Sequence, residues 1–190
     1  MINLFPTPLN IVENNSVDTK DLVDHCINLS KQVERGGKHW LSKNVFNSSY
    51  THNIYKDSKF KDLNNWIAKE VNLFANALGF KKLNLDKTNG WFNLYNKKDY
   101  QEWHNHNFAL ISVIYYLKAN SNSAKTHFKS PLPDNPNTPD FNPSNIYTWK
   151  TYFVEPKQDT LVIFKSDLDH SVEAQKEDLT RITLAYNFYD

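Results

Sequence analysis

The sequence of 190 residues contains one cysteine, Cys26, and only four glycines. A lone cysteine excludes an internal disulfide, so a reducing compartment is the economical setting and we predict a cytoplasmic protein. The first residues lack the basic segment and apolar run of a signal peptide, and no window approaches the roughly 18 apolar residues of a membrane span. We therefore expect neither secretion nor a membrane partner.

The sequence also lacks an excess of charge of either sign. Its 22 basic and 21 acidic side chains give a formal net charge of +1, and the two signs are mixed along the chain. A protein that binds nucleic acid through a broad surface usually shows a basic excess or a basic stripe. The composition therefore argues against nucleic acid as a partner and leaves only a small local patch open.

Apolar residues make up 39% of the chain and aromatic residues 14%, enough for a sizeable core in which aromatics fill much of the space. The length favours one domain over residues 1–190. The first half carries two helical patterns, 18–34 and 58–78, with apolar residues three and four apart. Asp18 and Ser58 stand at the expected N-terminal caps, and Gly79 follows the second helix as a C-terminal cap.

Beyond residue 80 the pattern changes from helical to strand-like. Five stretches combine β-branched, aromatic and aliphatic residues without glycine or proline: 91–95, 108–117, 146–154, 161–165 and 181–189. Residues 125–129 are a further candidate for a short strand. Residues 2–13 suit an edge strand or extended arm, and a short strand is expected around 50–55. Residues 130–144 hold five prolines and predict an irregular surface loop. Helices followed by antiparallel strands indicate an α+β, mainly β protein, either a β-sandwich or a jelly roll, with the helical region 1–80 packed on one side of a core formed by 81–190.

Two of the seven histidines are one residue apart and precede a strand-like run: His104 and His106. In an extended backbone they share one side, because strand side chains alternate with a period of two. Such a pair alone is as often structural as metal-binding. His170, at the end of a second apolar stretch, is our candidate for a third ligand, because imidazole is the commonest neutral nitrogen ligand.

An arginine, Arg181, opens the last apolar strand eleven residues after His170. A buried guanidinium is costly unless an anion meets it, and its planar fork binds a carboxylate with two hydrogen bonds. Thr183 shares its face of the strand and can add a hydroxyl. The alternative is that Arg181 faces solvent or pairs with Asp178 or Glu177.

These residues resemble the iron(II)- and 2-oxoglutarate-dependent oxygenases, and within them a 2OG-Fe(II) oxygenase family of marine bacteria and phages. The similarity spans nearly the whole chain. It rests on Leu-Phe-Pro-Thr-Pro at 4–8, Trp40-Leu-Ser, the helix 58–79, Trp91-Phe-Asn, His104-x-His106, Tyr-Tyr-Leu at 115–117, Phe164-x-Ser-x-x-x-His170 and Arg181-Ile-Thr183.

The resemblance implies a double-stranded β-helix, the cupin-like form of the jelly roll, and a dioxygenase that hydroxylates its substrate. By that resemblance His104, His106 and His170 bind Fe(II), and Arg181 with Thr183 holds the 2-oxoglutarate carboxylate. It also implies cosubstrate contacts from Asn93 and Tyr95, and from Tyr115 or its neighbour Tyr116. The implied partners are O2 and a small-molecule or peptide substrate; the substrate's identity and the oligomeric state stay open, with a homodimer among the alternatives.

The chain departs from the family pattern at the third ligand. His106 stands where the superfamily has Asp or Glu, so that the usual two histidines and one carboxylate become three histidines. Asp99 and Asp169 are nearby carboxylates that could hold an imidazole in place. Asp159 stands where the family usually has a turn glycine, and Lys165 where it has a proline.

Three other functions remain compatible with the same residues. The first is a three-histidine, cupin-like metalloenzyme that does not use 2-oxoglutarate, or a zinc hydrolytic site; neither needs a buried carboxylate clamp. The second is a non-catalytic jelly-roll binding module that keeps the histidines. The third is nucleic-acid demethylation, which the neutral charge disfavours.

Overall fold

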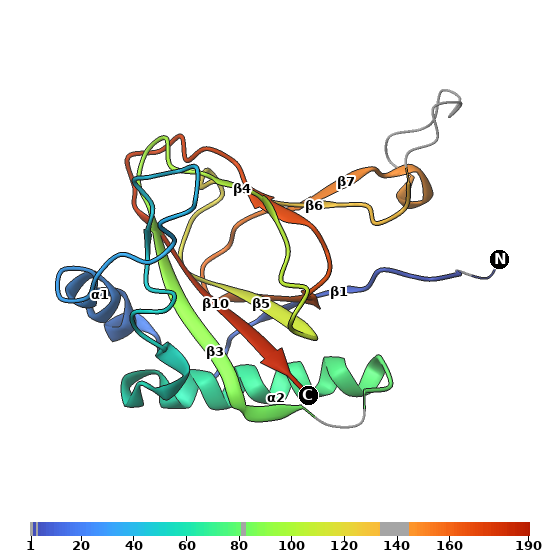
Figure 1. Cartoon of the computed structure of the whole chain (residues 1–190), viewed down its shortest axis with the longest axis horizontal. Coiled ribbons are helices and arrows are strands. Elements are labelled where there is room, and N and C mark those ends of the chain that lie inside the picture. Colours follow the sequence, from blue (N-terminus) through green and yellow to red (C-terminus); the bar gives the residue numbers. More distant parts are fainter. Residues whose placement is uncertain (1, 3, 81–82, 134–144) are drawn as a thin grey trace.

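Two antiparallel sheets face each other in the computed structural model, which describes residue 2 and residues 4–80, 83–133 and 145–190 (Figure 1). The larger sheet has the strand order β1-β8-β5-β10-β3-β2, and the smaller has the order β4-β9-β6-β7. The strands are β1 (Leu9–Glu13), β2 (Phe46–Asn47), β3 (Asn84–Tyr95), β4 (Gln101–His104), β5 (Ile111–Lys118), β6 (Thr126–Lys129), β7 (Thr151–Val154), β8 (Thr160–Lys165), β9 (His170–Val172) and β10 (Arg181–Tyr189). The result is the predicted jelly roll.

The central strand of the larger sheet is β10, which pairs with β3 on one side and β5 on the other. Its side chains alternate between two environments, as a strand requires. Ile182, Leu184, Tyr186 and Phe188 enter the core on the helical side. Arg181 and the alternate residues after it point instead into the space between the sheets, where a ligand can reach them.

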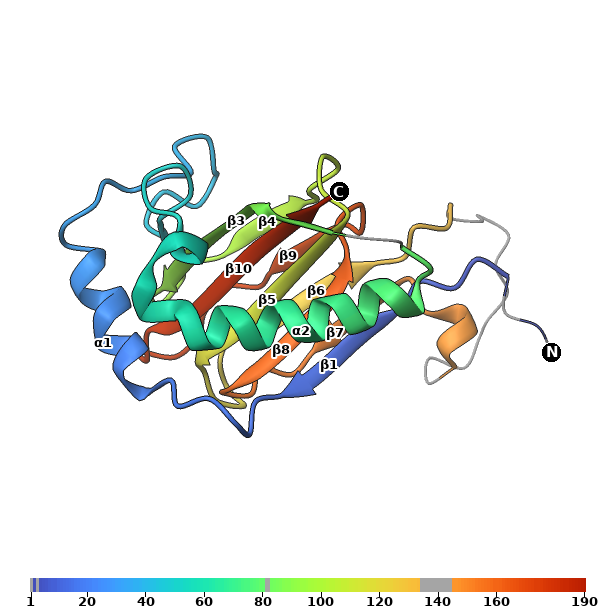
Figure 2. The same ribbon diagram turned by 90° about the horizontal axis from the view of Figure 1, so that it is seen from below.

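The helices cover the outer face of the larger sheet: α1 is Lys20–Leu29 and α2 is Lys61–Ala77. Figure 2 shows α2 lying across the strands of that sheet. The buried stripe of α2 includes Leu63, Ile67 and Val71, each at most 1% exposed, which confirms the predicted helical spacing. Three short 3-10 helices complete the list, η1 (Ile54–Lys56), η2 (Ser58–Phe60) and η3 (Ile146–Thr148).

The helix ends differ in part from the prediction. Gly79 follows the C-cap residue of α2, Leu78, and has φ +80°, the left-handed conformation that glycine adopts at no steric cost. Ser58 does not cap α2, because it lies in η2, and the side chain of Asp57 caps that turn by accepting from the Lys59 amide. The first helix ends at Leu29, several residues before the predicted 34.

The strand predictions were partly wrong. Residues 50–55 do not form a strand, and the first half contributes β1 and the two-residue β2 to the larger sheet instead. The predicted strand 146–154 begins with η3, and only 151–154 is β7. Sequence patterns also missed β4 and β9, which are short and polar. Of the proline-rich stretch 130–144, residues 134–144 lie outside the described part of the chain.

A second, smaller core lies between the two sheets. It joins residues of β5 and β8 in the larger sheet to residues of β6 and β7 in the smaller; its members include Ile114, Tyr116, Phe128, Val154, Val162 and Phe164. The ring centroids of Phe128 and Phe164 lie 5.0 Å apart at an interplanar angle of 73°, a favourable edge-to-face contact. This packing fixes the distance between the sheets and so fixes the site between them. Within the described residues, no helix is both long and apolar enough to cross a membrane.

Candidate metal centre and anion site

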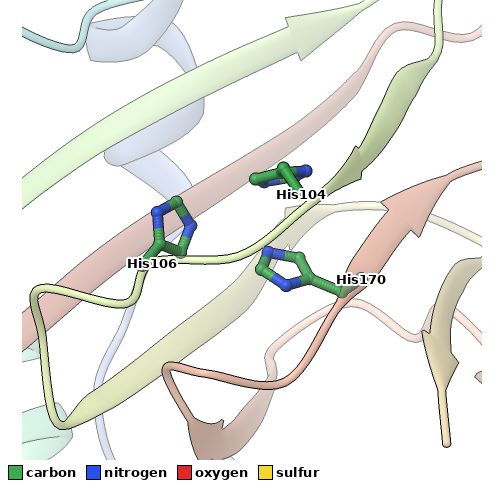
Figure 3. Close-up of side chains that lie close together, drawn as sticks. All are labelled: His104, His106 and His170. Atoms are coloured by element: carbon green, nitrogen blue, oxygen red, sulfur yellow. The ribbon is translucent and has the colours of Figure 1, made fainter. Parts of the chain in front are cut away.

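Three imidazoles converge at the edge of the smaller sheet, as Figure 3 shows: His104 at the end of β4, His106 in the loop after it, and His170 at the start of β9. Their ring centroids are 4.2 Å apart for His104 and His170, 5.2 Å for His104 and His106, and 5.3 Å for His106 and His170. One ring nitrogen from each lies within 4.8 Å of the others, so the three could hold one metal ion.

Strand pairing brings the two distant sequence segments together. His104 on β4 is the register partner of His170 on β9, so a ladder between two short strands sets the closest ring contact. The two histidines do not lie in one strand: β4 ends at His104, and the His106 amide donates to the Ser166 carbonyl, 2.8 Å away. That bond turns the loop so that the second imidazole faces the first.

Backbone hydrogen bonds select the tautomer of two of the rings. Nδ1 of His104 lies 2.8 Å from the Glu102 carbonyl, and Nδ1 of His170 lies 3.0 Å from the Leu168 carbonyl. A carbonyl oxygen only accepts, so each Nδ1 carries the proton and each Nε2 keeps its lone pair. This is the arrangement in which histidines bind metal, with the second nitrogen fixing the ring.

Burial keeps all three imidazoles neutral. It lowers the pKa of His106 to about 4, with a further contribution from His104. It also lowers the pKa of His104, and that of His170 well below its ordinary value, where the other two rings add to the effect. At neutral pH the site therefore offers uncharged nitrogen donors, the form that binds a metal ion.

The loop that carries His106 is tied to the strand that carries His170. Asn105 donates from Nδ2 to Oδ1 of Asp169 across 2.7 Å, and the Asp169 carbonyl accepts from the Lys129 amide. Asp169 thus contributes by joining the two ligand-bearing segments and not by a bond to an imidazole. The other nearby carboxylate, Asp99, accepts from the Asn96 amide, and it has no hydrogen bond to these histidines.

Arg181 is completely buried at the start of β10 and has no carboxylate partner within the described residues, which excludes the alternatives considered for it, exposure or a pair with Asp178 or Glu177. Lys97 pairs with Asp178 instead. Only Nη2 of Arg181 has a hydrogen-bond acceptor, Thr126 Oγ1 at 3.2 Å; Nε and Nη1 have none within the described residues. A buried cation with two idle donors is a site for an anion.

The neighbours of Arg181 shape that anion site. Its guanidinium carbon lies 4.9 Å from the ring centroid of Tyr95 and 5.2 Å from that of Tyr116. Both distances fall within the range of a cation–π contact. Burial raises the pKa of Tyr95 to about 12, although the charge of Arg181 acts in the opposite direction, so the phenol stays neutral.

Thr183 and Asn93 lie on adjacent strands and line the same cavity. The side chain of Asn47 donates from Nδ2 to Asn93 Oδ1 across 2.9 Å, and Asn93 Nδ2 donates to Thr183 Oγ1 across 3.4 Å. Because the threonine oxygen accepts from Asn93, its own proton is available to the cavity. The structure thus places Thr183, Asn93 and Tyr95 together in the lining of this cavity.

Tyr115 is not brought there. It lies on the helical side of β5, where its hydroxyl donates to Asp159 Oδ1 across 2.8 Å and its ring meets Trp66 edge-on. Tyr116 points instead into the space between the sheets, beside Arg181, because consecutive strand residues point to opposite faces. Asp159, at the position of the family's glycine, has φ +58°, so the turn keeps its left-handed conformation with a residue that tolerates it.

Sequence reasoning missed several polar residues of the cavity. Gln101 is buried at the start of β4, and its Oε1 has no partner within the described residues. Thr126 lies behind the cavity wall, where it is the acceptor for both Arg181 and the Tyr116 hydroxyl. Ser112 and Asn187 line the far end. Alternation along 181–187 could have indicated Asn187, whereas the others have no motif that marks them.

The assembled cavity combines two complementary halves. Three neutral nitrogen donors can bind a divalent metal ion, and beside them a buried guanidinium with a threonine hydroxyl can bind a carboxylate. The walls between them are largely apolar, so water is limited and electrostatic attraction is stronger than in solvent. The arrangement suits a metal ion and an organic acid bound side by side.

Comparison with known proteins gives the same answer. The family described as "Putative 2OG-Fe(II) oxygenase" matches residues 89–187, which include all three histidines and Arg181. A search of curated proteins finds no match.

Solved structures with the same fold include a Pseudomonas putida prolyl-4-hydroxylase, 14% identical, with a TM-score of 0.67 over 97% of this chain and 94% of that one. A Trichoplax adhaerens prolyl hydroxylase, in complex with a hypoxia-inducible factor peptide fragment, is 14% identical with a TM-score of 0.64 over 96% and 83%. The epimerase SnoN, in complex with Fe3+, α-ketoglutarate and nogalamycin RO, is 13% identical with a TM-score of 0.62 over 97% and 79%. At such identities the likeness concerns the fold.

Proposed function

Because this chain belongs to the 2OG-Fe(II) oxygenase family, we propose that His104, His106 and His170 hold Fe(II) and that Arg181 holds the distal carboxylate of 2-oxoglutarate. Thr183 donates a second hydrogen bond to that carboxylate, and Asn93 with Tyr95 packs around it. The reaction is the hydroxylation of an organic substrate by O2.

One observation carries this proposal: Arg181 is buried with two unpartnered donors in the cavity that the three histidines line. A metal site alone does not need such a cation. A buried guanidinium without an anion costs several kcal/mol of desolvation, so the residue makes sense only when a carboxylate is bound. This favours a 2-oxoglutarate enzyme over a three-histidine metalloenzyme without that cosubstrate and over a non-catalytic module.

The donor set fits the metal that the family uses. Two imidazoles have Nδ1 bonded to a backbone carbonyl, and burial lowers the pKa of all three, so neutral nitrogens are presented without loss of a proton on binding. His106 replaces the anionic ligand of the usual triad. The ligand set is therefore neutral, and the carboxylate of the cosubstrate becomes the main source of negative charge beside the metal.

When bound, Fe(II) and 2-oxoglutarate supply the oxidation: O2 is consumed, the cosubstrate loses CO2 to become succinate, and a substrate C–H becomes C–OH. The chain itself supplies position and environment. Arg181 and Thr183 fix one end of the cosubstrate, while the rings of Tyr95 and Tyr116 exclude water from the guanidinium. The Asn105–Asp169 bond keeps the two ligand-bearing segments at a fixed separation.

We further infer that the substrate is a small molecule or a peptide, which the peptide complex of one structurally similar hydroxylase supports. The unpaired, buried Cys26 supports a cytoplasmic setting, and a homodimer is one assembly to examine. The chain works as one domain, since β1 and β2 of the first 80 residues extend the sheet formed by the rest.

Anaerobic addition of Fe(II) and then 2-oxoglutarate to the purified protein tests the proposal. We expect a weak visible charge-transfer band that requires both additions, because only a cosubstrate bound to the metal produces it. A folded sample without such a band would contradict the proposal and favour the enzyme or module that does not use 2-oxoglutarate.

A further inference from the structure

Three small polar side chains form a chain of hydrogen bonds at the end of the cavity opposite Arg181. Ser166, just after β8, lies 2.8 Å from Ser112 of β5 between their hydroxyl oxygens, and Ser112 lies 2.7 Å from Oδ1 of Asn187 on β10. Ser112 and Asn187 line the same cavity as the three histidines. None of the three belongs to the metal or carboxylate sites described above.

The direction of each hydrogen bond follows from counting protons. Ser166 is fully buried, and within the described residues Ser112 is the one acceptor that its hydroxyl reaches. A buried hydroxyl that does not donate is costly, so Ser166 donates to Ser112. Ser112 must then donate onward, and the atom of Asn187 that meets it must be the accepting Oδ1 and not the amide nitrogen.

This fixes the orientation of the Asn187 carboxamide. With Oδ1 turned to Ser112, Nδ2 points away, and it has no acceptor within the described residues. The side chain is 7% exposed, yet Nδ2 is not among the atoms sealed from solvent. Asn187 therefore presents the two N–H groups of Nδ2 to the cavity, and Ser112 and Ser166 fix the orientation of its carboxamide.

The position of these donors separates them from the cosubstrate. Arg181 and Asn187 are six residues apart on one strand, or about 20 Å at the rise of a β-strand, far more than a five-carbon diacid spans. Between them on the adjacent strand stands Trp91, whose indole meets the His106 ring edge-on with centroids 5.6 Å apart. The Asn187 end is thus the side of the metal centre that 2-oxoglutarate leaves open.

We propose that the side-chain amide of Asn187 binds the substrate by donating a hydrogen bond to one of its carbonyl or carboxylate oxygens, and that Ser112 and Ser166 are positioning residues for this amide. The inference rests on the proposed function for its metal and cosubstrate. It narrows the substrate to molecules with an oxygen acceptor near the oxidised carbon, such as an amide, a ketone or an acid, and it disfavours a cationic group at that point.

The test uses the full chain loaded with Zn(II), which stands in for iron, and 2-oxoglutarate. Two probes of similar size, N-methylacetamide and methylammonium, are titrated while the backbone amide signals of Ala185 and Phe188 are followed by NMR. We expect the wild type to bind N-methylacetamide and not methylammonium. Asn187→Asp replaces the donor by an acceptor of the same shape, so we expect N-methylacetamide to bind about tenfold more weakly and methylammonium to bind instead.

A second variant tests the positioning role. Ser166→Ala removes the hydroxyl that forces Ser112 to donate, so the amide of Asn187 can rotate. We expect the affinity of this variant for N-methylacetamide to fall several-fold. It should not gain the methylammonium binding that is expected for Asn187→Asp. If Asn187→Asp does not fold, Asn187→Leu carries the test, and it should lose N-methylacetamide without gaining methylammonium.

Unchanged probe affinities in a folded Asn187 variant would overturn the inference. The anaerobic band with Fe(II) and 2-oxoglutarate, recorded on the same variant, separates this failure from failure of the proposed function. A normal band with unchanged probe binding rejects the role of Asn187 alone, whereas a wild type without the band rejects the proposed function itself.

Discussion

Two groups of histidines lie on opposite faces of the larger sheet, and they differ in what meets their nitrogens. On the helical face, Asp57 Oδ2 accepts from Nε2 of both His25 and His52, each at 2.9 Å. Between the sheets, His104, His106 and His170 bring one ring nitrogen each within 4.8 Å of the others, and no carboxylate from the described part of the chain joins them. The same residue type thus serves structure where an anion satisfies it and is available to a metal where none does.

The comparison shows that unmet bonding capacity is a better guide to function than residue type. At Asp57 burial alone would raise the pKa of the carboxyl, but hydrogen bonds from His25, the Lys59 amide and His52 lower it below its ordinary value. That cluster is complete. At Arg181 the two unpartnered nitrogens, and at the metal centre the three converging ring nitrogens, are themselves the evidence for ligands.

The largest contrast between the groups should come from removing one imidazole from each. His170→Ala removes a direct metal ligand, and we expect Fe(II) affinity to fall more than about 100-fold, beyond the range typical of residues that only support a ligand. His52→Ala is the matched control, since it should lower the melting temperature and leave Fe(II) affinity unchanged. Calorimetry under anaerobic conditions measures the melting temperature and the Fe(II) affinity of each variant. Equal Fe(II) affinities for the two variants would contradict the distinction between the two groups of histidines.

A second expected effect concerns Arg181, whose charge has no anionic partner within the described residues when no ligand is bound. Arg181→Met removes two charge-assisted hydrogen bonds, so 2-oxoglutarate affinity should fall at least about 100-fold. The ligand-free variant should be as stable as the wild type or more stable, because a buried, unpaired charge is removed.

Arg181→Lys keeps the charge and loses the planar fork, so it should bind 2-oxoglutarate with intermediate affinity. Thermal unfolding with and without 2-oxoglutarate measures these effects together, since a ligand bound only by the folded state raises its melting temperature. A strongly destabilised Arg181→Met protein would show that the contacts of the arginine with Thr126, Tyr95 and Tyr116 outweigh the cost of its buried charge, and would contradict this account.

The smallest effect is expected at the complete cluster. In Asp57, Oδ2 accepts from both imidazoles and Oδ1 accepts from the Lys59 amide. Asp57→Asn leaves one accepting oxygen and turns an NH2 donor toward the other position, so we expect a loss of about 1–2 kcal/mol in the free energy of unfolding at pH 7. A depressed carboxyl pKa stabilises the fold above the unfolded value of about 3.9, and this contribution is lost as pH falls through the folded pKa.

Urea unfolding should therefore show a difference between wild type and Asp57→Asn that is constant near neutrality and shrinks in acid. Asp178→Asn is the control, because that carboxylate is exposed and forms a surface ion pair with Lys97; its effect should be within about 0.5 kcal/mol. A pH-independent difference for Asp57→Asn would mean that its charge is not what holds the two histidines.

The sequence was sufficient to predict the class of fold, the longer strands and the residues with distinctive chemistry. His104, His170 and Arg181 could be recognised because each follows or opens an apolar strand and because the family pattern links them. Their meeting could not be derived from local pattern, since it depends on the ladder between β4 and β9, whose residues are too few and too polar to show a strand periodicity.

Some of the remaining differences between the predicted and the observed site arise because adjacent residues of a strand face opposite sides of the sheet. Tyr115 and Tyr116 are two adjacent tyrosines, so the sequence alone does not show which of them faces Arg181. The register of β5 decides that it is Tyr116. Ser112 looks like an ordinary strand residue, and the alternation along β10 places Asn187 on the face of Arg181 without indicating a role for it. Their role emerges only when every hydrogen-bond donor and acceptor around them has been counted in three dimensions.

The most direct test of the central claim is succinate formation from 2-oxoglutarate in air with Fe(II), comparing the wild type with His104→Ala. The three-histidine site and the arginine clamp together predict iron-dependent succinate in the wild type, and none above background in a folded His104→Ala protein. Succinate formed at the same rate by both proteins, or by neither, would contradict the assignment of the three histidines as the metal centre of a 2-oxoglutarate oxygenase.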